Sequence, residues 1–221
     1  MVVGIRSGYG ASARADERQN PLSRIPTPGI LAQSVLFVAI FYGINTIWER
    51  DAGILNRYLV SPAPRSALVL GKALSSTVRG LSQASVVYLL AIFLGIPVSG
   101  QMGHVLAVIV FIALGAGVFS TFSVVVACIV RTRERFLGIG QVLTMPIFFA
   151  SNAIYPIHLM PRWLQIVSRL NPLTYEVDAL RGLMLRNGIS NIGVGADFAV
   201  LLGVFMSMVF FAAQLYPRMG E

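Results

Sequence analysis

Few side chains in this sequence are suited to catalysis, and those few lie apart. His104 and His158 sit near the ends of apolar runs, with no carboxylate or second histidine close by in the sequence. Ser120 and Ser123 have no nearby base either, so a nucleophilic site would need a partner from elsewhere in the fold. No residues have the spacing of a metal site. We therefore expect neither a catalytic residue nor a bound metal.

The pair Gly71-Lys72 is superficially similar to the end of a phosphate-binding loop. Such a loop needs a glycine five positions before its second glycine, and Ser or Thr directly after the lysine. Ser66 and Ala73 stand at those positions. Because the pattern fails twice, we expect no nucleotide site and no cofactor in this chain. ATP hydrolysis coupled to the protein would have to occur in a partner.

The composition favours a protein solvated by lipid. Hydrophobic residues make up 56% of the 221 residues and charged residues only 12%, whereas soluble domains carry about 25% charged residues. The mean hydropathy is +0.75. The net charge of +8 arises from basic residues at the ends of apolar runs, where membrane proteins place them. We expect no nucleic-acid partner, and the single cysteine, Cys128, excludes an intramolecular disulfide.

The long apolar runs predict an all-α integral membrane protein with about five spans. The runs do not alternate as β-barrel strands do, and each is near the ~20 residues that cross a bilayer as a helix. We assign residues 1–28 to a non-membrane segment, 29–216 to the transmembrane domain and 217–221 to a cytosolic tail. None of the five spans holds Asp or Glu. The predicted spans are Ile30 to Trp48, Ser82 to Val98, Val105 to Val130, Phe136 to Tyr155 and Phe198 to Leu215.

The distribution of arginines predicts the orientation of the spans. The turn Ser99 to Gly103 has no basic residue, whereas Arg131 to Arg135 has three. Cytoplasmic loops carry the excess of basic residues, so we place the Arg131 loop in the cytosol and the Ser99 turn outside. Glu49 to Gly80 then also lies in the cytosol. The external N-terminal segment carries four arginines, so the rule is obeyed only in part.

Two segments between spans have amphipathic patterns. Residues 49–72 place Ile54, Leu55, Tyr58 and Leu59 on one helical stripe, which suits either docking into a groove on a partner protein or resting on lipid headgroups. Residues 156–187 form two short helices interrupted at Asn171-Pro172, too short and too charged to span. We expect these to be external re-entrant or interfacial helices, with Asp178 and Arg181 spaced for an ion pair.

Four amide side chains fall within the predicted spans. A polar side chain in lipid is costly and faces protein or a cavity. Hydrogen bonding between helices and contact with a transported substrate are both compatible with these positions. The candidate path-lining residues are Asn45, Gln83, Gln141 and Asn152.

The stretch from Pro28 to Lys72 resembles the second span and coupling region of ABC-2 type permeases, the family of daunorubicin-type drug exporters. Residues 171–185 resemble the family's signature before its last span. Together the resemblance covers residues 28–216. It implies that residues 171, 172, 175, 178 and 181 form the signature: Asn171, Pro172, Tyr175, Asp178 and Arg181. It further implies an ATPase-coupling set of Glu49, Arg50, Gly53, Ile54, Leu55, Tyr58, Leu59, Pro62, Arg65, Gly71 and Lys72.

The resemblance implies a permease subunit in the cell membrane that moves a hydrophobic or amphipathic substrate, a drug or a lipid, out of the cell. Its implied partners are a separate ATPase, which binds ATP and Mg, and a second permease copy. Family members have six spans, and this chain starts where the loop after the first span would lie, so we expect that span to be missing. The alternatives are an exporter of lipid-linked glycan, a non-transporting membrane subunit and, from another class, an enzyme acting on lipid.

Overall fold

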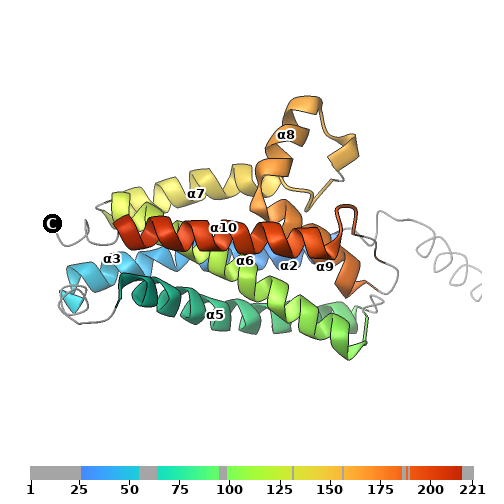
Figure 1. Ribbon diagram of the computed structural model, residues 1–221, viewed down its shortest axis with the longest axis horizontal. Coiled ribbons are helices and arrows are strands. Elements are labelled where there is room, and N and C mark those ends of the chain that lie inside the picture. Colours follow the sequence, from blue (N-terminus) through green and yellow to red (C-terminus); the bar gives the residue numbers. More distant parts are fainter. Residues whose placement is uncertain are drawn as a thin grey trace, which may run out of the picture.

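The chain forms a bundle of helices in the computed structural model, which describes residues 26–54, 64–94, 99–130, 132–155, 157–185, 188 and 190–215. Every regular element within these residues is a helix, so the all-α prediction is confirmed (Figure 1). The elements are α2 (Pro26–Phe41), α3 (Gly43–Asp51), α5 (Arg65–Phe93), α6 (Met102–Ile129), α7 (Arg133–Phe149), η2 (Ile157–Leu159), α8 (Arg162–Leu170), α9 (Pro172–Met184) and α10 (Val194–Leu215).

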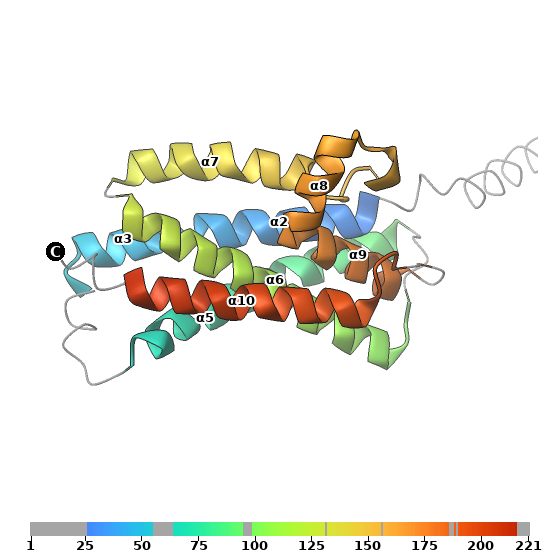
Figure 2. The same ribbon diagram turned by 45° about the horizontal axis from the view of Figure 1, so that its top comes forward.

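Four helical stretches of the described residues are long and apolar enough to cross a membrane: Thr27–Asp51, Ser66–Phe93, Met102–Ile129 and Val194–Leu215. They correspond to four of the five predicted spans. The fifth, α7, runs beside them (Figure 2) but has 17 residues, about 25 Å of helix at 1.5 Å per residue. It ends six residues earlier than predicted.

The early end of α7 has a local cause. The last carbonyl groups of a helix lack partners within it. Here the Ser151 amide turns back to the Phe148 carbonyl at 3.2 Å, and the Asn171 amide group donates to the Ile147 carbonyl at 2.6 Å. These bonds satisfy the helix end and tie it to the segment that follows.

The helix that contains the span predicted from Ser82 begins at Arg65, four to five turns earlier than that span. Its charged residues argued against a helix in lipid, but they have partners in the bundle. The ammonium group of Lys72 forms an ion pair with Glu49, and the guanidinium of Arg79 lies 5.3 Å from the centre of the Tyr42 ring. With these charges compensated, nothing between Arg65 and Phe93 breaks the helix.

Helix α6 lies at the centre of the bundle, in contact with α2, α5, α9 and α10. It crosses α2 and α3 closely where these two are interrupted at Tyr42. The Gly43 amide donates to Ser123 Oγ at 3.1 Å, and the Ser123 hydroxyl donates to the Ile40 carbonyl. A Cβ at Gly43 would overlap Ser123, so glycine is required for this approach.

The bundle has two distinct ends. The end of α3, the start of α7 and the end of α10 lie together, because Arg133 reaches Asp51 at 2.9 Å. We call this the α3 end. The opposite end holds the start of α6 with α8 and α9, where the Ser99 amide donates to the Met184 carbonyl at 2.8 Å. Residues 49–54 and 132–135 therefore share one end and Ser99 lies at the other, which agrees with the predicted relative placement.

Candidate functional site

At the α3 end, a buried lysine joins α5 to α3. Lys72 is 8% exposed. Its ammonium group donates to Thr46 Oγ1 at 3.1 Å and to the Glu49 carboxylate. Because a buried ammonium is stable only when it is paired and hydrogen-bonded, these contacts set the distance between the two helices. Glu49 and Lys72 both belong to the predicted coupling set, and the structure brings them together across 23 positions of sequence.

A second set of contacts joins α3 to α7. Two nitrogens of Arg133 donate to one oxygen of Asp51, at 3.1 and 2.9 Å, and the guanidinium lies 4.3 Å from the centre of the Trp48 ring. Arg50 lies 3.4 Å from the other Asp51 oxygen. Sequence reasoning missed Trp48, Asp51 and Arg133 as a group, since only their common position at helix ends hinted at it.

Some of the remaining residues of the predicted coupling set lie within the described part of the chain. Gly53 has a φ of +71°, which favours glycine, and it turns the chain after α3. Ile54 is 38% exposed and Gly71 has open space around it. Arg65 begins α5. Four members lie outside the described residues, so the apolar stripe stays a prediction: Leu55, Tyr58, Leu59 and Pro62.

At the opposite end, the residues of the signature hold α9 in place. Asn171 caps the helix, since its side-chain oxygen accepts from the Leu173 amide at 3.0 Å, and Pro172 occupies the first helical turn, where a missing N–H costs nothing. The Tyr175 hydroxyl donates to the Arg169 carbonyl of α8 at 2.6 Å. The predicted interruption at Asn171-Pro172 is confirmed, because Asn171 ends α8 and starts α9.

Asp178 and Arg181 do not form the predicted direct ion pair. The Asp178 carboxylate instead accepts hydrogen bonds from the Ser190 hydroxyl and the Ile192 amide at 2.9 Å, and from the Asn191 side chain at 3.1 Å. Arg181 donates to the Asn152 carbonyl at 2.7 Å. The loop before α10 thus supplies the hydrogen-bond donors to the Asp178 carboxylate. The Asn152 side chain also lies 3.5 Å from Asp178, so Asn152 contacts both charged residues.

The α9–α10 loop places a second carboxyl group, Asp197, near Asp178. The Ser190 oxygen accepts from the Gly193 amide at 2.8 Å and lies 2.9 Å from Asp178 Oδ2 and 3.3 Å from Asp197 Oδ2. A hydroxyl has one proton to donate, so it cannot serve both carboxylates. Both contacts can be hydrogen bonds if the Asp197 carboxyl carries a proton. Asp197 then donates to Ser190 Oγ, and the Ser190 hydroxyl donates to the ionised Asp178 carboxylate.

Glu176 is a fully buried carboxyl group that has no hydrogen-bond partner among the described residues. Both of its oxygens lack one, and the group lies directly against Gly115, near the middle of α6, where a Cβ would overlap it. Helix α9 therefore packs against the middle of α6. Its charges had argued for a surface position, but Glu176, Asp178 and Arg181 are buried against other parts of the bundle.

The four amides predicted to line a path do not come together. Among the described residues, no hydrogen bond joins any two of them. Asn45 and Gln83 are half-buried on α3 and α5, Gln141 is exposed on α7, and Asn152 is buried beside Asp178. Only Asn152 belongs to a polar cluster. Asp197, which sequence reasoning left just outside its predicted span, lies within α10.

One histidine–serine pair forms at the connection between α5 and α6. His104 Nδ1 lies 2.9 Å from Ser99 Oγ, and the Ser99 carbonyl accepts from the Tyr88 hydroxyl at 3.1 Å. No carboxylate of the described residues contacts this histidine. The pair therefore lacks the third group that orients a catalytic histidine, and its bonds close the turn between the two helices.

Comparisons with known proteins show what the sequence is similar to. The family described as ABC-2 type transporter matches residues 2–185. A protein of Cyanophora paradoxa named as the transport permease ycf38 is 31% identical over 78% of this chain and 60% of its own length. The daunorubicin resistance ABC transporter permease protein DrrB1 of Streptomyces coeruleorubidus is 26% identical over 71% of this chain and 56% of its own. The chain spans about half to three fifths of the length of such relatives.

Proposed function

The chain belongs to the ABC-2 type transporter family, and on that premise we propose that it is the transmembrane permease subunit of an ATP-driven exporter in the cell membrane. The proposed substrate is a hydrophobic or amphipathic molecule, a drug or a lipid. The observation that supports coupling to an ATPase is made at the α3 end, where ion pairs join α3 to both α5 and α7. ATP and Mg would bind to the separate ATPase subunit.

The contacts at the α3 end can transmit a displacement of α3 to the neighbouring helices. Residues 49–54 lead into the segment proposed to dock on the ATPase. A displacement of α3 is passed to α5 through Lys72 and Glu49, and to α7 through Arg133 and Asp51. Three helices then move as one body, as rigid-body mechanisms of alternating access require.

A second permease copy is the proposed partner within the membrane. The family implies such pairing, and the helices of one chain leave large apolar side chains uncovered on α7, among them Val142 at 70% and Phe149 at 59% exposure. Lipid and a second copy would share these surfaces. A path for substrate between two copies would pass the exposed Gln141.

A transport assay tests the function. The chain and its ATPase are purified together and placed in proteoliposomes with a fluorescent lipophilic amine or a fluorescent phospholipid as the probe. We expect ATP-dependent export of a probe that vanadate inhibits. Vanadate-sensitive movement of lipid-linked glycan alone would favour the glycan exporter. Chemical conversion of lipid would favour an enzyme, and a complex without transport would favour a non-transporting subunit.

A charge-swap experiment tests the coupling role of Lys72. Lys72→Gln should leave co-purification with the ATPase intact, because the proposed docking residues are elsewhere, and should lower efflux. The pair Lys72→Glu with Glu49→Lys restores opposite charges and should recover efflux. Ser207→Ala on α10, whose exposed hydroxyl donates to the Val204 carbonyl of the same helix, serves as the control. Normal efflux by Lys72→Gln, or no recovery by a well-folded charge swap, contradicts the coupling role.

A further inference from the structure

Helix α8 stands out from the bundle at the end opposite α3. It runs across the direction of the spans rather than along them (Figure 1). Its described contacts to the rest of the chain are few. Ser168 lies 3.2 Å from Thr174 of α9, and Gln165 donates to the Met160 carbonyl at 2.8 Å. These bonds fix one side of the helix and leave the other side uncovered.

The uncovered side of α8 is strongly apolar. Trp163, Ile166, Val167 and Leu170 have the spacing i, i+3, i+4 and i+7, which places them on one helical face. Their exposed fractions are 67%, 64%, 45% and 80%. Ser168, on the opposite side, is fully buried. A helix whose apolar face is turned away from the bundle needs an apolar surrounding for that face.

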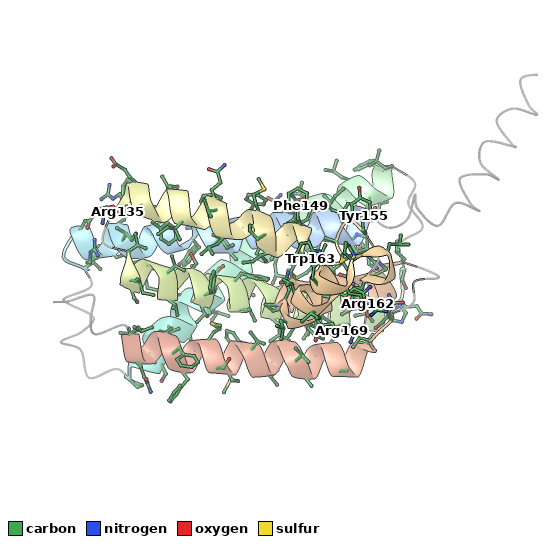
Figure 3. All side chains as sticks on the ribbon, turned by 90° about the horizontal axis from the view of Figure 1, so that it is seen from above. Arg135, Phe149, Tyr155, Arg162, Trp163 and Arg169 are labelled. Carbon is green, nitrogen blue, oxygen red and sulfur yellow. The ribbon has the colours of Figure 1, made fainter. Side chains whose placement is uncertain are left out.

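Two exposed arginines flank this apolar face. Arg162 and Arg169 are seven residues apart, two helical turns or about 10 Å, so they lie on the same side of the helix. Figure 3 shows both on the side of α8 away from Phe149 and Tyr155, with Trp163 between. No described carboxylate contacts either arginine.

The described residues at this end of the molecule expose arginines but no carboxylates. Glu176, Asp178 and Asp197 are the acidic residues of the described chain at this end, and all three are completely buried. The exposed cations of α8 therefore face outward without an exposed anion of the described chain beside them. Their complement must come from outside the described residues.

We propose that α8 is an interfacial helix that binds anionic phospholipid. Its apolar face inserts at the boundary between headgroups and acyl chains, with Trp163 at the depth tryptophan prefers. Arg162 and Arg169 each bind a headgroup phosphate, and their separation allows two lipids to be held at once. The alternative occupant, a second copy of this chain, would cover the apolar face, but the described residues of that copy expose no anion at this end for the arginines.

Fluorescence of Trp163 tests the insertion. The sequence has two tryptophans, so Trp48→Phe leaves Trp163 as the only one. The full chain is placed in nanodiscs of phosphatidylcholine with about 30% phosphatidylglycerol, which gives the bilayer surface a negative potential that attracts arginine. We expect strong quenching by a nitroxide at a shallow acyl position, weaker quenching by a deep one, and little quenching by aqueous iodide. Dominant iodide quenching, or shielding from all three quenchers by a second copy, overturns the proposal.

Lipid enrichment tests the arginines. Phosphatidylglycerol retained by the purified chain is measured by mass spectrometry against phosphatidylcholine from the same mixture. Neutralising Arg162 and Arg169 with glutamine should lower the enrichment roughly fivefold per arginine at low salt. The charge-preserving variants Arg162→Lys and Arg169→Lys should retain most of it. Unchanged enrichment in the double glutamine variant, or equal losses in the glutamine and lysine variants, refutes binding by charge. Neither result depends on transport, so the proposal is separable from the proposed function.

Discussion

The two carboxyl groups around Ser190 lead to opposite predictions for similar substitutions. Asp178→Asn should destabilise the protein strongly, whereas Asp197→Asn should be nearly neutral. The reason is the proton count at Ser190, which has one hydrogen and two carboxyl oxygens within 3.3 Å. Asp178 accepts from all its neighbours and must be ionised. Asp197 has an unpartnered oxygen and fits as the neutral donor.

The cost of Asp178→Asn follows from the bonds that it removes. Asparagine at this position retains one acceptor oxygen and replaces the other with an NH₂ group. The NH₂ group would then face the Ile192 amide and the Ser190 hydroxyl, both at 2.9 Å from the present oxygen. Each lost bond to a charged acceptor is worth about 1.5–3 kcal/mol, so the loss is about 3–6 kcal/mol. The ratio of folded to unfolded protein therefore falls at least ~100-fold.

Asp197→Asn retains the hydrogen bond to Ser190. The asparagine NH₂ group can donate to Ser190 Oγ in place of the carboxylic acid proton, and the remaining oxygen replaces one that has no partner now. We expect a change within about 1 kcal/mol, typical of a substitution that removes no interaction.

Thermal unfolding of the detergent-solubilised chain, followed by size-exclusion of a fluorescent fusion, measures both variants. For a chain of this length a loss of 3 kcal/mol lowers the melting temperature by about 6–12 °C. Asp178→Asn should show at least this shift and Asp197→Asn less than about 4 °C. If Asp197→Asn is as destabilising as Asp178→Asn, Asp197 is ionised and the proton count is wrong.

Three further outcomes are expected. Gly115→Ala should lower the melting temperature because its Cβ would overlap the Glu176 carboxyl, and adding Glu176→Ala should recover part of the loss; a neutral Gly115→Ala would show that α9 can withdraw from α6. Cysteine at the exposed Gly100, in a Cys128→Ser background, should react with an impermeant maleimide in intact cells, whereas cysteine at Thr132 should not; the reverse labelling would invert the topology. Leu55→Asp with Leu59→Asp should abolish co-purification with the ATPase while membrane insertion stays normal, and retained co-purification would contradict docking by this segment.

The sequence alone determined that the chain is a membrane-embedded helical protein. Transfer of apolar side chains from water to lipid depends on the run of residues itself and on no distant partner. Four stretches predicted this way are helices of spanning length. The break at Asn171-Pro172 was equally predictable, because proline cannot continue a preceding helix and asparagine caps the next one.

Only the tertiary structure decided where the polar residues lie, because the cost of a charge in a helix depends on what another helix brings to it. The sequence placed Lys72 in a cytosolic loop, whereas the structure places it within α5, with Glu49 and Thr46 as its partners. Asp178 and Arg181 have the spacing of an ion pair, but the loop at Ser190 and the carbonyl of Asn152 are their partners. Those partners are between 12 and 29 residues away in sequence, and no local pattern encodes such a distance.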